Sequence, residues 1–181
     1  MKRFFPILCM LLLSACSEQA QQSAEPETPP LIAAAERGDL VLIDQLLSKR
    51  PLVDQRDACA WTPLMKAALN GHSEAAARLL SAGADPELGD KGGYTALMLA
   101  ASNNHVETLR LLLAHAADPN RQEATKGWSA LIWAAKQGHL ASVEALLAAG
   151  ADRQLRDRQG RSALDWALAE SQTAVATALL Q

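Results

Sequence analysis

Apolar residues recur along most of the chain in a fixed order that predicts a row of helix pairs. A Thr or Ser followed by apolar residues returns at intervals of 33, 34 and 33 residues. These starts are Thr62-Pro63-Leu64, Thr95-Ala96-Leu97, Ser129-Ala130-Leu131 and Ser162-Ala163-Leu164. Thr and Ser are favourable helix N-caps, and each start is followed by small residues that leave room for close helix packing. A Gly-His or Asn-His step and a Leu-rich run come next in the fuller units, so the pattern predicts two helices per unit.

The stretches between these helix pairs are polar and predict extended hairpins. The Leu-rich runs close with Gly-Ala-Asp or Ala-Ala-Asp, and Gly83 and Gly150 suit a left-handed C-cap. Acidic residues recur in register within the polar stretches, at Asp57, Asp90, Glu123 and Asp157. Their regular recurrence favours a role as hairpin-turn acceptors over a role as paired catalytic carboxylates.

Composition agrees with an all-α chain. Hydrophobic residues make up 49% of the 181 residues and aromatic residues only 4%, with 36 Ala and 30 Leu against 5 Val and 4 Ile. Ala and Leu are strong helix formers, whereas Val and Ile favour strands. These counts argue against a β-sandwich, a barrel or a Val/Ile-rich parallel sheet.

A period near 33 residues with these features resembles the ankyrin repeat, over about residues 31–181. The resemblance implies an all-α solenoid of about five stacked helix pairs with short β-hairpin connections. The expected repeats are about 31–55, 56–88, 89–121, 122–155 and 156–181. The first and last repeats are atypical, as a linear stack needs in order to cover its terminal faces.

Two departures from the family pattern predict local losses of stability. The family's His three residues after the capping Thr is replaced throughout, by Met65, Met98, Ile132 and Asp165. We therefore expect its side-chain hydrogen bond to the capping residue to be lost in every repeat. Ala60 and Ala116 stand where Gly is expected, and Ala at a positive φ costs about 1 kcal/mol relative to Gly.

The first residues predict a targeting signal. A short basic segment precedes an apolar stretch, 4–13, that is too short to span a bilayer and fits the hydrophobic region of a secretory signal peptide. The next residues, Leu13-Ser14-Ala15-Cys16, resemble the bacterial lipoprotein signal (the lipobox). The resemblance implies that residues 1–15 are removed and that Cys16 carries a thioether-linked diacylglycerol. The alternative is an ordinary signal peptide with a chance cysteine.

The expected mature chain is a lipid-anchored protein. Residues 16–30 contain no large apolar residue and predict an acylated N-terminus followed by a disordered tether. Ser17 is compatible with transport to the outer membrane, so the expected location is the periplasmic face of the outer membrane of a Gram-negative bacterium. Only Cys59 then remains as a thiol, either as a partly buried small residue or as a site of intermolecular pairing.

Charge and motifs predict neither catalysis nor nucleic-acid binding. The formal net charge is −3, and removal of residues 1–15 lowers the basic count from 17 to 15 against 20 acidic residues, a net charge of −5. A nucleic-acid partner would require a basic excess. The sequence contains no phosphate-binding Gly loop, no Gly-x-Ser-x-Gly and no His-Glu-x-x-His. We therefore expect no catalytic residue, no metal, no cofactor and no small-molecule substrate.

The histidines fit this interpretation. Those at His72, His105 and His139 share one repeat position, which favours a structural role. His115 has only Asp118 near it in the sequence, too few ligands for a metal site.

Five aromatic residues outside the signal segment are the best candidates for partner contact. Trp61, Tyr94 and Trp128 each precede the capping residue of their repeat, and Arg161 holds the fourth such position. Trp133 and Trp166 share a position four residues after the capping Ser. Trp, Tyr and Arg are enriched at binding hot spots, so one interpretation is an aromatic strip on the concave face of the solenoid. The alternative is packing between repeats.

The residues at the last hairpin also leave two interpretations. Arg153, Arg156, Arg158 and Arg161 crowd that hairpin. They form either a solvated turn or a flank of the strip that attracts an acidic partner.

The family resemblance implies a non-enzymatic module that binds an unidentified protein on the concave hairpin and inner-helix face. The chain looks similar to small periplasmic ankyrin proteins associated with peroxide defence or envelope stress. It also looks like lipoprotein immunity proteins that neutralise membrane- or lipid-attacking effectors. A self-associating structural scaffold of the envelope is a third possibility, and the sequence does not choose among them.

Overall fold

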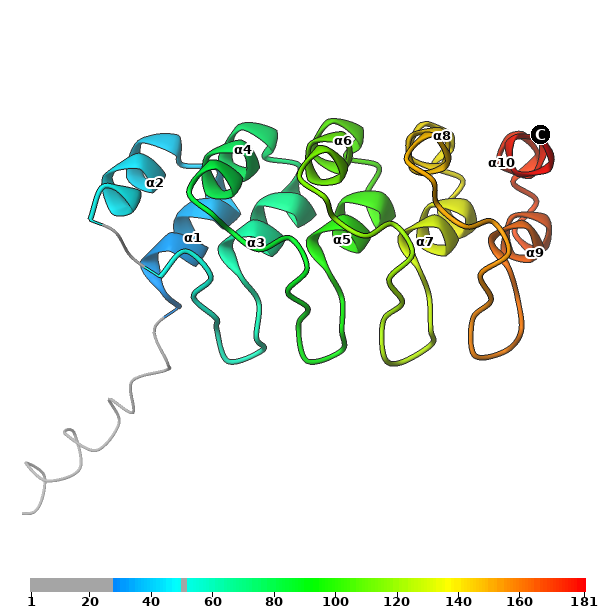
Figure 1. The fold of residues 1–181 in the computed structure, drawn as a ribbon, viewed down its shortest axis with the longest axis horizontal. Helices are drawn as coiled ribbons and strands as arrows, with labels where there is room; N and C mark the ends of the chain where they lie inside the picture. Colours follow the sequence, from blue (N-terminus) through cyan, green and yellow to red (C-terminus); the bar gives the residue numbers. More distant parts are fainter. Residues whose placement is uncertain (1–27, 50–51) are drawn as a thin grey trace, which may run out of the picture.

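Ten α-helices form in the residues that the structure, a computed structural model, describes, which are 28–49 and 52–181. They are α1 (Pro30–Arg37), α2 (Leu40–Leu47), α3 (Pro63–Asn70), α4 (Ser73–Ser81), α5 (Ala96–Ser102), α6 (Val106–Ala114), α7 (Ala130–Gln137), α8 (Leu140–Ala148), α9 (Ala163–Ala169) and α10 (Thr173–Leu180). The ten helices make five pairs, from α1 with α2 to α9 with α10. Figure 1 shows the pairs side by side in one row, with the even-numbered helices above the odd-numbered ones and the connecting hairpins below. The predicted all-α repeat solenoid is confirmed. The lipobox and Cys16 lie outside the described residues.

Each odd-numbered helix from α3 onward begins at the predicted cap. The side-chain oxygens of Thr62, Thr95, Ser129 and Ser162 accept hydrogen bonds from the backbone N–H groups three residues later. The expected loss of a side-chain bond to the capping residue is wrong in two repeats. The thioether sulfur of Met65 accepts a hydrogen bond from the backbone N–H of Thr62 at 3.4 Å. The Asp165 carboxylate accepts hydrogen bonds from the backbone N–H and the hydroxyl of Ser162, at 2.8 and 2.7 Å. Those bonds are the first cause of the lowered pKa of Asp165.

A tight left-handed turn joins the two helices of each pair. Gly71 ends α3 at φ 72°, and a Cβ built on it would lie 2.4 Å from Nδ1 of His105 in the next repeat. Only Gly fits such a place without displacing the ring. In two repeats the turn uses Asn104 (φ 57°) and Ser171 (φ 58°) instead.

The repeated histidines join neighbouring helix pairs. Nε2 of His72, His105 and His139 lies 3.2, 3.0 and 3.1 Å from a backbone carbonyl oxygen of the preceding odd-numbered helix or its end. A ring nitrogen that donates to a carbonyl in this way satisfies an otherwise orphaned helix-end acceptor. The interpretation of these residues as structural is confirmed.

The core runs along the length of the stack between the two rows of helices. Small residues of the odd-numbered helices are fully buried, including Ala67, Ala68, Ala100 and Ala101 at 0% exposure. They let the odd-numbered helices approach closely, while Leu79, Leu112 and Leu146 of the even-numbered row fill the space behind them. The Ala- and Leu-rich composition therefore follows from thin helix pairs that stack along a line.

The predicted hairpins are present but carry little strand structure. Single antiparallel bridges join Gly89 to Thr95, Gln122 to Ser129 and Arg156 to Ser162. Within the described part of the chain, no strand longer than these single bridges forms. Neighbouring hairpins are instead linked sideways by one backbone hydrogen bond each, from Lys91, Ala124 and Arg158 to carbonyls of Cys59, Gly92 and Lys126.

The last helix pair does not cover its outer face. Leu168 on α9 is 62% exposed and Leu180 on α10 is 71% exposed, and both line an open depression of about 300 Å³. At the matching positions of the preceding repeat, Ala135 is fully buried and Leu147 is half-buried. The expectation that the final repeat covers its terminal face is therefore wrong.

Candidate functional site

The acidic hairpin residues accept hydrogen bonds from backbone N–H groups of their own turns, as predicted. One carboxylate oxygen of Asp57 accepts from the backbone N–H groups of Cys59 and Trp61, at 2.8 and 2.9 Å. Asp90 does the same in the second hairpin, toward Gly92 and Tyr94. Each such turn fixes the aromatic residue that follows it at the base of the hairpin.

The third hairpin is one residue longer and uses Glu instead of Asp. The Glu123 carboxylate accepts from the backbone N–H groups of Thr125, Lys126 and Trp128, at 2.6, 2.7 and 3.0 Å. The extra methylene of Glu spans the extra residue, so Trp128 keeps the position that Tyr94 has in the preceding repeat. Burial alone would raise the pKa of Glu123, but these bonds and one from the Thr125 hydroxyl leave the pKa lowered.

Asp157 in the fourth hairpin accepts hydrogen bonds both from its own turn and from two indole rings. One of its oxygens accepts from the backbone N–H groups of Gln159 and Arg161, both at 2.9 Å. The other accepts from the indole N–H groups of Trp128 and Trp166, at 3.1 and 2.9 Å. Burial would raise the pKa of this carboxyl, whose side chain is 1% exposed, but the four donors outweigh it and the pKa is lowered.

Four of the five predicted aromatic residues form one cluster. The ring centroids of Trp128 and Trp133 are 4.5 Å apart, those of Trp128 and Trp166 are 5.0 Å apart, and those of Tyr94 and Trp133 are 6.0 Å apart. The tilted and edge-on geometries are those that aromatic pairs prefer. Trp61 lies apart from this cluster in the described residues, with the Lys66 ammonium 4.9 Å from its ring centre.

Exposure separates the five rings into two kinds. Trp128 is 4% exposed and Trp166 is 8% exposed, so both pack between repeats, and the packing interpretation accounts for most of their surface. Trp61, Tyr94 and Trp133 are half-buried and keep ring surface for a partner. The indole nitrogen of Trp133 is buried with no hydrogen-bond partner in the described residues.

Basic side chains cover the faces of the two buried indoles. The guanidinium of Arg161 lies 3.5 Å from the ring centre of Trp166, and the ammonium of Lys136 lies 5.0 Å from the same centre. The ammonium of Lys126 lies 4.3 Å from the ring centre of Trp128. Such contacts contribute about 0.5–2 kcal/mol each, depending on how far the cation is desolvated.

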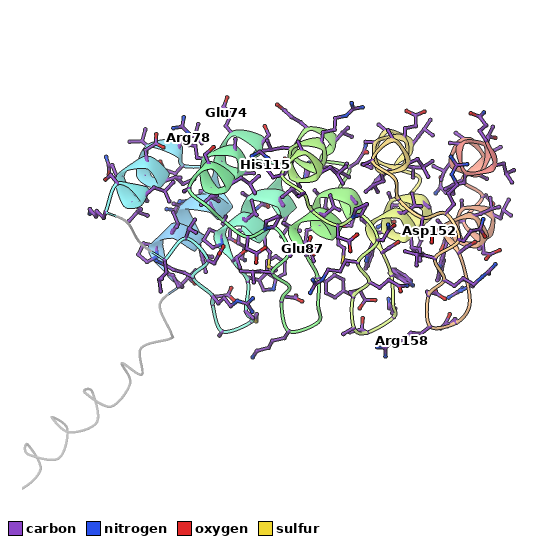
Figure 2. All side chains as sticks on the ribbon, viewed as in Figure 1. Glu74, Arg78, Glu87, His115, Asp152 and Arg158 are labelled. Carbon is purple, nitrogen blue, oxygen red and sulfur yellow. The ribbon has the colours of Figure 1, made fainter. Side chains whose placement is uncertain are left out.

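These rings and cations line a cavity of about 380 Å³ between the third and fourth hairpins and the ends of α7 and α9. We call it the basic-aromatic pocket. Its defining residues are Lys126, Trp128, Lys136, Arg158, Arg161 and Trp166. Asp157 is the single acidic residue of its lining. Figure 2 shows Arg158 at the hairpin edge of the molecule, opposite the edge at which Glu74 and Arg78 lie.

Sequence reasoning identified Arg161 and the rings but missed Lys126 and Lys136. A usable signal was present, because contacts between odd-numbered helices recur at separations of 30 and 34 residues. Lys136 contacts Trp166, 30 residues later, and forms an ion pair with Glu170, 34 residues later. Glu36 shows the same spacing: its carboxylate pairs with Lys66, and its backbone carbonyl accepts from the side chain of Asn70. The sequence left two interpretations of Cys59, a partly buried small residue or a site of intermolecular pairing. Cys59 is exposed, so the first interpretation is wrong.

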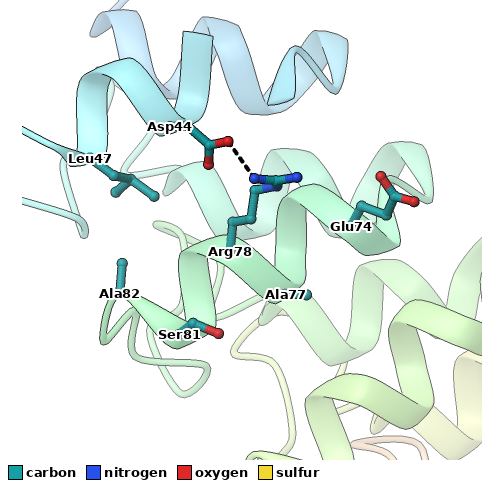
Figure 3. Close-up of a pocket in the computed structure, with 7 residues that line it drawn as sticks. All are labelled: Asp44, Leu47, Glu74, Ala77, Arg78, Ser81 and Ala82. Atoms are coloured by element: carbon teal, nitrogen blue, oxygen red, sulfur yellow. Dashed lines mark hydrogen bonds and ion pairs between the residues drawn. The ribbon is translucent and has the colours of Figure 1, made fainter. Parts of the chain in front are cut away.

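A second, wider depression lies on the even-numbered helices. It has a volume of about 620 Å³ and runs between α2 and α4, where Asp44 and Arg78 form an ion pair across it (Figure 3). Its lining has no aromatic residue, and its acidic residues, Asp44 and Glu74, outnumber its one cation. It therefore offers fewer anchoring groups than the basic-aromatic pocket.

Comparison with known proteins gives a family for the whole repeat array. A family model described as ankyrin repeats (3 copies) matches residues 6–90, 31–123 and 120–181. No curated protein matches the chain. Within the described ranges no helix has the length and hydrophobicity to cross a membrane, and no three His, Cys, Asp or Glu side chains gather as metal ligands would.

Proposed function

Because the chain belongs to the ankyrin-repeat family, a family of protein-interaction modules, we propose that it is a non-enzymatic, lipid-anchored module that binds another protein in the bacterial periplasm. The observation that carries the binding role is the cluster of rings and cations on the hairpin and odd-numbered-helix face. It combines half-exposed Tyr94 and Trp133 with the cations of the basic-aromatic pocket. Aromatic and Arg side chains fixed in place before binding are the groups that dominate protein interfaces.

Cross-linking in cells, followed by identification of the captured protein, tests the binding role. We expect one dominant partner with the unmodified chain and reduced capture with Tyr94→Ala combined with Trp133→Ala. The exposed Glu107→Ala variant on α6 serves as a control that leaves this face intact. Equal capture by all three proteins would place the interface elsewhere, and no partner at all would contradict the role.

The anchoring part of the proposal rests on Leu13-Ser14-Ala15-Cys16. Lipid chains on one cysteine give stable membrane attachment, because each buried CH₂ contributes about 0.8 kcal/mol. The proposed location is the periplasmic face of the outer membrane. Cys16→Ser should abolish lipid labelling and membrane fractionation; unchanged labelling would contradict the lipobox.

Two pathways fit a membrane-attached binding module. The partner is either an enzyme of peroxide defence or a toxic effector that attacks the membrane, and the anchor favours the second because it places an inhibitor at the target. Sensitivity of a deletion strain separates them: peroxide sensitivity supports the first, and killing by sibling cells supports the second.

Self-association is the alternative role, and the exposure of Cys59 favours it in an oxidising compartment. Non-reducing gels of the periplasmic protein should then show a dimer that Cys59→Ser removes. A monomer band in both proteins would contradict disulfide-linked self-association.

A further inference from the structure

We propose that the basic-aromatic pocket binds an acidic side chain, Asp or Glu, with an apolar neighbour, on the partner protein. The inference rests on the proposed protein-binding function and names the chemistry of the segment that the pocket accepts. It follows from the charge balance of the pocket, from the support of its walls and from its size.

The charge balance leaves two cations of the pocket without a partner. Lys136 forms an ion pair with Glu170, and Nε of Arg161 lies 3.8 Å from Asp157. Within residues 28–49 and 52–181, neither Lys126 nor Arg158 has a carboxylate within 4.0 Å. A carboxylate placed between these two side chains would gain charge-assisted hydrogen bonds from both.

The two unpaired cations are held close to each other by backbone structure. The backbone N–H of Arg158 donates to the carbonyl of Lys126 at 2.9 Å, so their side chains start from adjacent points on neighbouring hairpins. Glu123 and Asp157 fix the two turns from which these residues project. A ligand therefore meets cations on a fixed frame, which lowers the entropy cost of binding.

Arg161 adds a further cation at the wall. Its Nε is buried and has no hydrogen-bond partner in the described part of the chain, because the Asp157 carboxylate, its ion-pair partner, lies 3.8 Å away. The hydrogen-bonding capacity of this N–H is therefore unused. A carboxylate bound next to Trp166 would also lie near this guanidinium, which stacks on that ring.

The walls and the size of the pocket select a protein segment with an apolar residue beside the acid. Trp128 and Trp166 form the apolar walls, and a volume of about 380 Å³ accommodates one or two side chains. The formal net charge of the whole chain is −3, so a long polyanion would be repelled outside the pocket. A short segment with an acidic and an apolar residue is attracted by the positive charge of the pocket and places no further negative charge against the rest of the chain.

A peptide titration tests this proposal directly. The full chain, solubilised in a non-ionic detergent, is titrated with the capped peptide Ser-Glu-Leu-Glu-Leu-Glu-Ser and with its Gln counterpart, and tryptophan fluorescence is followed. We expect saturable binding of the Glu peptide, at least about tenfold tighter than that of the Gln peptide, and weakening with added salt. Equal affinity for the two peptides would overturn the proposal.

Charge-matched variants locate the binding. Lys126→Gln combined with Arg158→Gln should weaken Glu-peptide binding at least about tenfold. Lys91→Gln combined with Arg110→Gln removes the same charge from exposed sites outside the pocket and should leave the affinity within about twofold. An equal loss in both variants would show non-specific attraction and overturn the proposal. Thermal melts confirm that both variants are folded.

Two further outcomes are informative. Vesicles of phosphatidylglycerol that bind through Lys126 and Arg158, without any peptide binding, would show that the anion is a lipid headgroup and overturn the proposal. If the pocket variant still captures the cellular partner fully, the pocket inference fails while the protein-binding function stands. If no partner is captured in cells but the peptide binds through the pocket, the proposed function fails instead.

Discussion

Asp157 is the residue on which the candidate site depends most. Its carboxylate receives four N–H donors, two from the backbone of its own turn and two from the indoles of Trp128 and Trp166. Each bond favours the ionised form, and together they outweigh the burial of the group. One charge therefore couples the last hairpin to the rings that wall the pocket.

The lowered pKa of Asp157 predicts acid sensitivity. A group whose pKa is lower in the folded state adds stability above its unfolded value, near 3.8, and that stability is lost as the pH falls through the folded pKa. We expect the free energy of unfolding to begin to fall at about pH 5 and to keep falling as the pH drops below 3.8. Asp157→Asn should be less stable at neutral pH and show a shallower fall. Parallel urea titrations check this, and equal pH slopes in the two proteins would contradict it.

The burial of Trp128 predicts a stability role that Trp61 lacks. Trp128→Ala removes a buried ring together with its contacts to two neighbouring rings, so we expect a loss of about 3–5 kcal/mol in the free energy of unfolding. Trp61→Ala removes a half-buried ring outside the cluster and should cost less than half as much. Denaturant unfolding followed by circular dichroism measures both. Similar losses would mean that the two rings have equivalent surroundings.

The sequence predicted the register of these residues but not their burial. Caps and turn acceptors act within a few residues, so Thr62 and Asp57 could be assigned from local pattern alone. The burial of Trp128 depends on the fourth hairpin, 29 residues later, whose Asp157 receives the indole N–H. Neither that bond nor the position of Lys136 over Trp166 follows from the chemistry of any one repeat.

Among the elements, the turns that use Ala in place of Gly have a strained backbone. Ala60 has φ 66° and Ala116 has φ 62°, so the strained conformation predicted from the repeat pattern is present at both. The capping residues correctly predicted where the odd-numbered helices from α3 onward begin. The predicted β-hairpins, in contrast, form single bridges and no strands. The hairpins bond sideways to their neighbours, and a single repeat considered alone contains no trace of that pairing.

Replacing Ala116 with Gly should stabilise the protein. The left-handed conformation costs Ala about 1 kcal/mol more than Gly, and Gly loses part of that gain because its unfolded state is more flexible. We therefore expect Ala116→Gly to raise the free energy of unfolding by about 0.5 kcal/mol. Ala82, with φ −83°, is the matched control, and Ala82→Gly should destabilise. Chemical denaturation measures both variants, and destabilisation by Ala116→Gly would contradict the strain argument.

For the whole molecule, the important asymmetry is between the two ends of the stack. The first helix pair joins the second through the aliphatic core, in which Leu31 and Ile43 are buried, and through two exposed ion pairs, Glu36 with Lys66 and Asp44 with Arg78. The last two pairs share the buried cluster of Trp128, Asp157 and Trp166. Exposed ion pairs contribute little, with a median of about 0–1 kcal/mol. The sequence showed where the aromatic residues lie but not that they hold one end together.

The uncovered Leu side chains of the last pair should tolerate substitution. Leu168→Gln combined with Leu180→Gln should change the free energy of unfolding by less than about 0.5 kcal/mol per site, because both side chains are already exposed. Leu146→Ala, in the buried row, should cost about 2–5 kcal/mol. Thermal and urea melts at several protein concentrations measure this. A large, concentration-dependent loss in the Leu168 and Leu180 variant would show that another copy covers this face.

The linear arrangement also determines how the molecule responds to force. Helix pairs contact chiefly their immediate neighbours, so tension applied between the two ends passes through every interface in turn, as through links of a chain. Such a chain yields at its weakest link. The last interface adds the bonds of Asp157 to two buried indoles to its apolar contacts, so we expect the fourth and fifth helix pairs to separate only after an interface that lacks such a cluster.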